Sequence, residues 1–136
     1  MRVRPEAILA LALKWINAAV PEHRRQKEVT SGCFRTYFFL SPEVVSLVWE
    51  DLREVIEIHD DDFGGRCTIV HFLWTLYFYK TYNTWDHCAK FVGVCKQTYM
   101  EYVSKMTEFL QHIYDNEVSH FTFCFFSFMT VSVFSL

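Results

Sequence analysis

The chain has 136 residues, of which 51% are apolar and 18% aromatic, and its formal net charge at pH 7 is −3. This length fits one domain with a substantial core. The negative charge excludes a general electrostatic affinity for nucleic acid, so any DNA binding must come from a local surface. The five cysteines include no CxxC pair, and no signal peptide is recognised. We therefore expect reduced thiols in a nuclear or cytoplasmic protein.

The first predicted element is a helix over Pro5–Val20, which combines strong helix formers, a proline suited to the first turn and apolar residues at helical spacing. The densest positive cluster, His23–Lys27, follows it. Such a cluster could bind phosphate or act as a nuclear import signal, but its shortness favours a solvated connector. We assign residues 1–32 to this helix and connector.

Two core helices are predicted next. After the aromatic segment Phe34–Leu40, Ser41 is a good N-cap and Pro42 suits the first position of an amphipathic helix that runs to about Ile58. Further along, Thr68–Thr81 is apolar almost all round, which predicts a buried central helix. His71 lies on that helix, and we interpret it as a core residue.

The segment between these helices contains three consecutive aspartates, Asp60, Asp61 and Asp62. Calcium loops place their oxygen ligands at alternate positions with a glycine at a fixed offset, and this segment lacks that spacing. Adjacent aspartates also point in different directions. We therefore interpret the segment as a solvated loop.

The most specific pattern is Thr84–Tyr114, which predicts a helix, a tight turn and a second helix. Ala89 is the small residue that a helix-turn-helix needs in its first helix, and Gly93 suits the turn. Apolar residues occupy the positions expected on the inner face: Cys88, Val92, Val94, Tyr99 and Tyr102. Patterns of this kind also fit helical hairpins that do not bind DNA.

In a helix-turn-helix, the first turns of the second helix face the base edges of a major groove. The residues that we predict to contact DNA are Lys96, Gln97 and Met100 at the base edges, Ser104 on the same outward face, and Lys90 and Lys105 at phosphates. Between residues 80 and 113 four lysines stand against Asp86, Glu101 and Glu108. That excess is small, and Glu101 would repel the backbone unless it pairs with a cytosine amino group.

No catalytic or metal-binding pattern stands out. Cys88 and Cys95 flank the predicted turn with His87 nearby, but zinc sites need closer paired spacing, and Cys88 is an inner-face position. The serine, histidine and aspartate residues form no nucleophile motif, and no glycine-rich phosphate loop occurs. We therefore expect no catalytic residue, no metal ion, no cofactor and no small-molecule substrate.

Residues 118–136 change in composition, because they carry no formal charge and are rich in phenylalanine, serine and threonine. This length barely reaches that of a membrane span, and its polar residues and acidic flank disfavour an anchor. A non-native tail from a shifted frame or a read-through intron fits the composition better. We assign 33–117 to a helical domain and 118–136 to this irregular apolar tail.

The order of these landmarks resembles the N-terminal region of PIF/Harbinger-type transposases, which are transposon-encoded endonucleases of the DDE superfamily. The resemblance covers about Phe34–Tyr114. Its marks are the serine-proline helix start, the LW-x-L-x-F-x-KTY run at Leu73–Tyr82, and the glycine-valine turn before a T-aromatic-x-x-aromatic-V helix. It implies a helix-turn-helix domain that recognises transposon ends and precedes a separate nuclease domain.

Two departures from the family pattern limit what carries over. Relatives usually have a basic pair where this chain has Met100 and Glu101. The nuclease domain, which carries three metal-binding carboxylates, has no counterpart within these 136 residues. A two-metal site needs carboxylates from separated strands, whereas the acidic residues here fall on predicted helix surfaces or in one loop.

We therefore expect a mainly α, small helical bundle that contains a helix-turn-helix and acts as a truncated, non-catalytic, transposase-like fragment. It would bind double-stranded DNA weakly and in a salt-sensitive manner. One alternative is a helical protein–protein interaction module that binds a second copy or a helical partner, which the near-neutral outer face favours. Another is a fragment tethered to a membrane through 118–136.

Overall fold

The computed structural model describes residues 2–60, 63–81 and 83–116. These ranges contain α1 (Pro5–Ala18), the short 3-10 helix η1 (Glu22–Arg24), α2 (Ser31–Phe38), α3 (Pro42–His59), α4 (Ile69–Thr81), α5 (Trp85–Val92) and α6 (Lys96–Asn116). Within them no strand occurs, and the expectation of a mainly α bundle is confirmed. The predictions for Asp61, Asp62 and 118–136 fall outside the described residues.

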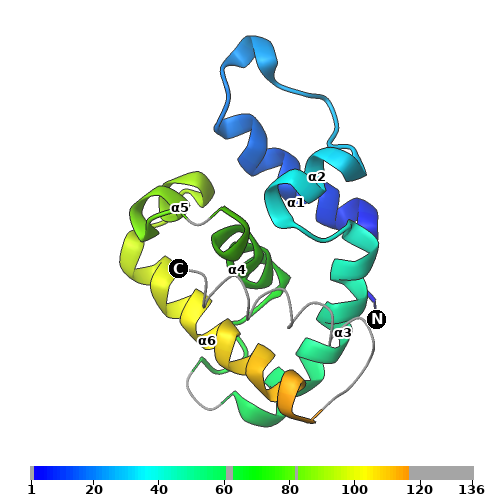
Figure 1. The fold of residues 1–136 in the computed structure, drawn as a ribbon, viewed down its shortest axis with the longest axis vertical. Helices are drawn as coiled ribbons and strands as arrows, with labels where there is room; N and C mark the ends of the chain where they lie inside the picture. Colours follow the sequence, from blue (N-terminus) through cyan, green and yellow to red (C-terminus); the bar gives the residue numbers. More distant parts are fainter. Residues whose placement is uncertain (1, 61–62, 82, 117–136) are drawn as a thin grey trace.

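Helix α4 lies at the centre of the bundle, with the other helices around it (Figure 1). It packs against α6, α2 and α5, while α3 packs against α1 and α6. Every residue from Phe72 to Tyr77 is buried. This confirms the predicted central helix, because a helix that is apolar on all sides is stable only when neighbours cover all of them.

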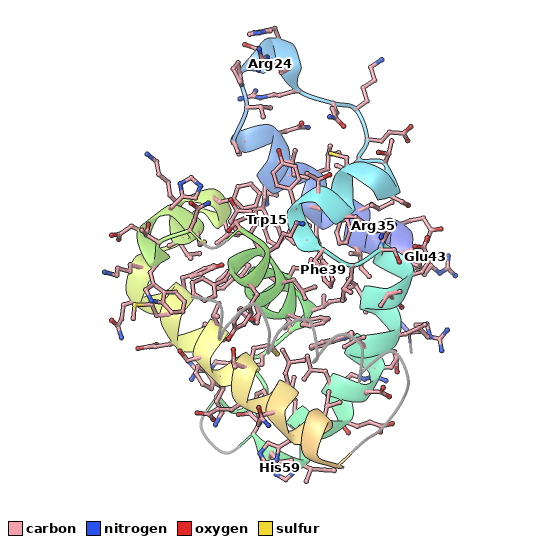
Figure 2. All side chains as sticks on the ribbon, viewed as in Figure 1. Trp15, Arg24, Arg35, Phe39, Glu43 and His59 are labelled. Carbon is pink, nitrogen blue, oxygen red and sulfur yellow. The ribbon has the colours of Figure 1, made fainter. Side chains whose placement is uncertain are left out.

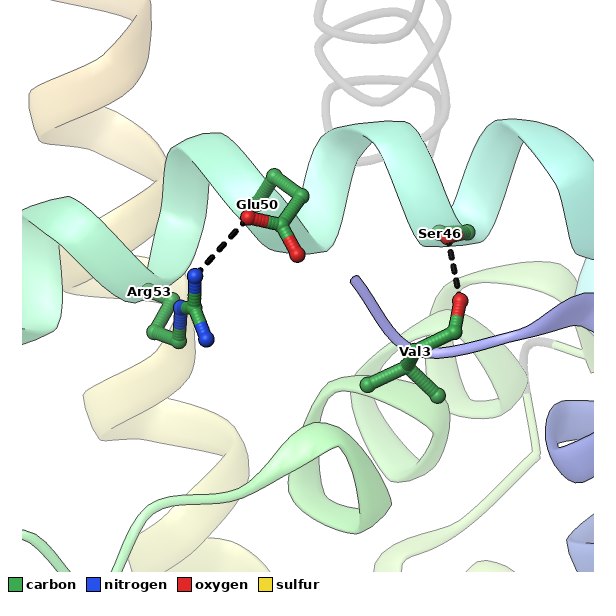
Figure 3. Close-up of polar contacts among 4 residues, drawn as sticks. All are labelled: Val3, Ser46, Glu50 and Arg53. Carbon is green, nitrogen blue, oxygen red and sulfur yellow. Dashed lines mark hydrogen bonds and ion pairs between the residues drawn. The ribbon is translucent and has the colours of Figure 1, made fainter. Parts of the chain in front are cut away.

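The N-terminal helix belongs to the same core. Ile8, Ala12 and Ile16 are buried on one face of α1, which packs against α3. Ahead of α1, the hydroxyl of Ser46 on α3 donates a hydrogen bond of 2.5 Å to the carbonyl oxygen of Val3 (Figure 3). The same helix carries an ion pair of 2.9 Å between Arg53 and Glu50, one turn apart (Figure 3).

Among the described helices, α2, α3 and α5 each begin at a hydroxyl N-cap. The side chains of Thr30, Ser41 and Thr84 each accept a hydrogen bond from the backbone N–H three residues later, which satisfies one of the free donors at a helix start. The caps at Ser41 and Thr84 confirm the sequence predictions. The helix that Thr30 begins, α2, was not predicted, because its eight residues are too few to show a helical period.

The turn between α2 and α3 is tight. Phe39 adopts a φ of 73°, a region that side chains other than glycine rarely occupy, and the N–H of Leu40 donates to the carbonyl oxygen of Phe38 at 2.8 Å. The Phe39 ring lies 5.9 Å from the ammonium of Lys80 on α4. Figure 2 shows Phe39 between the end of α2 and the start of α3.

In the loop after α3, Asp60 has a structural role. Its two carboxylate oxygens accept hydrogen bonds of 2.9 Å from the N–H groups of Phe63 and Gly65. Asp60 therefore holds the loop closed. Among the described helices, none is both long enough and apolar enough to cross a membrane.

Candidate nucleic-acid interface

The helix-turn-helix arrangement forms where the sequence predicted it. Gly93 ends α5 with a φ of 77° in the left-handed region, and the N–H of Val94 donates to the carbonyl oxygen of Ala89 at 3.0 Å. Helices that end with this hydrogen-bond pattern usually have glycine at the left-handed position. Other residues are strained at a positive φ. Open space surrounds the position of a Cβ on Gly93, so its backbone conformation alone explains the glycine.

The inner face of the motif packs against α4. Cys88, Ala89, Val92 and Tyr99 are buried, and Val94 and Tyr102 are partly buried. The rings of Tyr99 and Trp74 stack at 5.5 Å between centroids, and those of Tyr102 and His71 at 3.9 Å. The predicted inner-face positions are therefore the ones that join the motif to the bundle.

His71 is partly buried and stacks on Tyr102 at the border of the core, so the prediction of a core residue holds only in part. Its Nδ1 accepts a hydrogen bond of 2.9 Å from the N–H of Thr68, which requires a lone pair on that nitrogen. Burial lowers the pKa of His71 from 6.5 to about 4. The imidazole is therefore neutral at pH 7.

Most of the predicted DNA contacts lie on the outward side of α6 or α5. Lys90, Lys96, Gln97 and Ser104 are exposed, and Met100 is partly exposed. The ammonium of Lys96 lies 4.0 Å from the Asp86 carboxylate, with 52% of the lysine side chain exposed. An ion pair this open to solvent holds Lys96 only weakly.

Lys105 does not lie on the outward face, and that prediction is wrong. Only 13% of its side chain is exposed, and its ammonium lies 3.3 Å from Glu108 and 5.3 Å from the centroid of the Phe109 ring. At about 100° per residue, Lys105 is turned roughly 80° away from Gln97 and toward Phe109. Lys105 therefore lies at the border of the buried face of α6, where neighbouring side chains cover most of it.

Glu101 remains in the middle of the outward face. It is exposed, and its carboxylate accepts a hydrogen bond of 3.1 Å from the side-chain amide of Gln97. The pair leaves the other amide N–H and the amide oxygen of Gln97 open to further hydrogen bonds. Glu101 also adds a negative charge to this face, so the surface is polar rather than strongly basic.

The two thiols that flank the turn have opposite environments. Cys88 is buried, and burial raises its pKa. Cys95 is exposed just before α6, and hydrogen bonding from the Thr98 hydroxyl, 3.1 Å from its sulfur, lowers its pKa. In the part of the chain that the structure describes, no three His, Cys, Asp or Glu residues gather in a way that could hold a metal ion.

A groove beside α5 is a feature that the sequence did not reveal. Its volume is about 500 Å³, and it is lined by alanines at the end of α1, by tyrosines of α2 and α4, and by His87, Lys90 and Phe91 of α5. The sequence predicts a phosphate contact for Lys90, but it does not indicate that His87 lines a groove. Four separate helices form the walls, so no local pattern could have indicated the groove.

Comparison of the chain with protein-family models, with curated proteins and with solved structures finds no match.

Proposed function

We propose that this chain binds duplex DNA through α5 and α6, with the start of α6 facing base edges in a major groove. The observation that supports this most is the turn at Gly93. It ends α5 so that α6 begins with Lys96 and Gln97 exposed, while Tyr99 anchors the same helix in the core. A major groove is wide enough to admit one α-helix presented in this way.

The exposed side chains suit the chemistry of base edges. A lysine ammonium can donate to the two acceptors of guanine, and a glutamine amide can both donate to and accept from adenine. Glu101 accepts from Gln97 here and could accept from the amino group of cytosine instead. Met100 offers an apolar contact of the kind that a thymine methyl group makes.

The proposed binding is weak and sensitive to salt. Affinity for DNA comes largely from cations that neutralise phosphates. On this surface Asp86 and Glu101 oppose Lys90 and Lys96, and Lys105 is covered. The resemblance to Harbinger-type transposases adds the proposal that the ligand is a transposon end.

The proposal is binding without cleavage. The acidic side chains on this surface have other positions or roles: Asp86 is exposed beside Lys96, and Glu101 accepts from Gln97, while Asp60 closes the loop after α3. Cleavage by two metal ions needs carboxylates that converge on one point.

DNA binding is a better proposal than association through these helices. Among the described residues, the large apolar side chains that are exposed are Leu47 and Ile58, both on α3. The outward side of α5 and α6 therefore lacks the exposed apolar anchors on which protein–protein interfaces usually depend.

The test is a titration of a fluorescent mixed-sequence duplex of about 20 base pairs, followed by anisotropy over a salt series. Lys96→Ala should weaken binding several-fold and reduce the slope of log K against log salt by about one. Gln97→Ala should weaken binding without changing that slope, because glutamine carries no charge. Lys105→Ala is the matched lysine control and should leave the slope unchanged.

Two results would overturn the proposal. The first is a wild-type chain that does not bind the duplex even at low salt. The second is a set of variants in which Lys96→Ala and Gln97→Ala bind as tightly as the wild type.

A further inference from the structure

The groove beside α5 carries one lysine and one histidine on its α5 side and no carboxylate among its lining residues. Lys90 and His87 lie one turn apart on α5, so their side chains share the face that lines the groove. The opposite wall is formed by Ala18 and Ala19 at the end of α1, which are small and neutral. An elongated anion can therefore approach Lys90 without meeting a bulky side chain across the groove.

The floor of the groove presents ring edges rather than ring faces. Phe91 stacks on Tyr77 with centroids 4.0 Å apart and on Tyr37 with centroids 5.8 Å apart, both nearly parallel. Because two neighbouring rings stack on Phe91, less of its face is open to a ligand than of its edge, where an aromatic ring is partly positive. Burial raises the pKa of Tyr77 to about 12, so its hydroxyl stays neutral. This floor suits an anion better than a stacked base.

The basic connector is fastened at the same end of α1. The side-chain amide of Asn17 donates to the carbonyl oxygen of Gln26 at 2.8 Å and accepts from its N–H at 2.9 Å, while Arg25 donates to the carbonyl oxygen of Asn17 at 3.1 Å. The hydrogen bond to Asn17, the residue before Ala18, therefore holds Arg25 at the end of α1. Figure 2 shows Arg24 at the tip of the connector, beyond the end of α1.

The groove lies close to the start of α6, the helix that we propose to face base edges. Asp86, next to His87 in sequence, lies 4.0 Å from Lys96 at the start of α6. Asp86 and the groove residues His87 and Lys90 lie within about 100° of one another around α5, so the groove and the start of α6 are neighbours on the same side of that helix. A helix whose first turn faces base edges has phosphates close beside it, since the major groove of DNA is only about 12 Å wide.

We propose that this groove binds the sugar-phosphate backbone of the duplex that α6 contacts, with Lys90 and His87 donating to phosphate oxygens and Arg25 held near the end of α1 that borders the groove. This proposal rests on the proposed function, because it adds a second contact surface to the same complex. It assigns the main phosphate contacts to α5 and the connector, in place of Lys105.

The experiment repeats the anisotropy titration with changes in the groove. Ala18→Glu places a carboxylate on the neutral wall and should weaken binding about tenfold at low salt, because a like charge beside a phosphate repels it. Ala18→Gln separates the effect of size from that of charge. Ala10→Glu is the matched control, since Ala10 is exposed on the same helix two turns earlier.

Lys90→Gln should reduce the salt slope by about one and weaken binding about fivefold, and the added change His87→Ala, which removes the imidazole donor, should weaken it further. Arg66→Gln removes an exposed cation from the loop between α3 and α4, at the other end of the bundle. It should change neither the salt slope nor the affinity for the duplex. Circular dichroism of each variant confirms that the fold is retained.

The outcomes separate the two proposals. If the wild type binds and Lys96→Ala weakens binding, but Ala18→Glu and Lys90→Gln match their controls, the groove proposal is overturned and the proposed function stands. If the groove variants weaken binding and Lys96→Ala does not, the groove is supported and the recognition surface on α6 is wrong. A wild type that binds no DNA overturns both.

Discussion

The hydroxyl of Tyr99 donates a hydrogen bond of 2.7 Å to the backbone carbonyl oxygen of Trp74, within the core between α6 and α4. Burial raises the pKa of Tyr99 well above its ordinary value, so the hydroxyl keeps its proton and can act only in the neutral form. The contact sets the rotation of α6 about its axis. With Tyr99 pointing inward, Gln97 and Ser104 on the opposite side of the helix point outward.

Replacing this hydroxyl tests how strongly α6 is anchored. Tyr99→Phe should lower the free energy of unfolding by about 1–2 kcal/mol, because a buried hydrogen bond is lost while the ring packing remains. Tyr79→Phe is the control, since its hydroxyl lies 3.1 Å from the Thr107 hydroxyl in a partly buried site. Urea unfolding should show a smaller decrease in the free energy of unfolding for Tyr79→Phe than for Tyr99→Phe. If the free energy of unfolding falls equally in the two variants, the Tyr99 hydrogen bond stabilises the fold no more than the partly buried one at Tyr79.

The turn of the motif can be tested with two glycines. Gly93→Ala should destabilise the fold by about 1–2 kcal/mol, because alanine is strained at a φ of 77°. Gly32→Ala, inside α2 with nothing within 4 Å of a Cβ, should stabilise it by about 0.5–1 kcal/mol through helix propensity. Thermal unfolding checks both predictions: the melting temperature should fall in Gly93→Ala and rise in Gly32→Ala. A stabilised Gly93→Ala variant would show that the left-handed turn is absent in solution.

Stability should fall with acid because of His71. Its pKa is about 4 in the folded chain and 6.5 without burial, so the unfolded chain binds the extra proton between these values. The contribution of neutral His71 is therefore complete above pH 6.5 and is lost progressively as the pH falls toward 4. Its size is on the order of 1–2 kcal/mol after allowance for partial exposure.

The variant that checks this is His71→Asn, whose side-chain oxygen can still accept from the N–H of Thr68. Urea unfolding at several pH values should give the variant a flatter dependence than the wild type between pH 4 and 6.5. If the two curves stay parallel over that range, another group causes the acid sensitivity.

The connector should depend on Asn17. Asn17→Ala removes both side-chain hydrogen bonds to Gln26, each worth about 1 kcal/mol. Trypsin cleavage after Arg24, Arg25 or Lys27 should therefore accelerate by up to about tenfold, since proteolysis follows local opening. Cleavage after Arg66 serves as the internal reference. An unchanged rate in the connector would show that Asn17 does not hold it in solution.

Local chemistry made several features of this fold predictable. Ser41 and Thr84 cap helices, and Gly93 ends one, because each acts on backbone groups within a few residues of itself. The ends of the predicted helices differ from the observed ones by one or two residues, as at Ala18 in place of Val20. These predictions needed no knowledge of the neighbouring helices.

Features that depend on packing were less predictable. The helical period puts Lys105 about 80° from Gln97, at the border of the outward face, and how far Phe109 covers it there depends on how α6 sits in the bundle. The sequence pattern does not indicate helix α2, because its eight residues, about two turns, carry little periodic signal. His87 had no apparent partner in sequence, and its neighbours in the groove come from other helices.

By itself, the sequence determined that the chain is helical, where the helix-turn-helix lies and which residue makes its turn, because hydrogen bonds between near neighbours control these properties. Only the tertiary structure decided which lysines are exposed, which hydroxyl anchors α6 and where a groove forms. Those properties depend on contacts between helices far apart in sequence, and burial is a property of the assembled bundle rather than of any one segment.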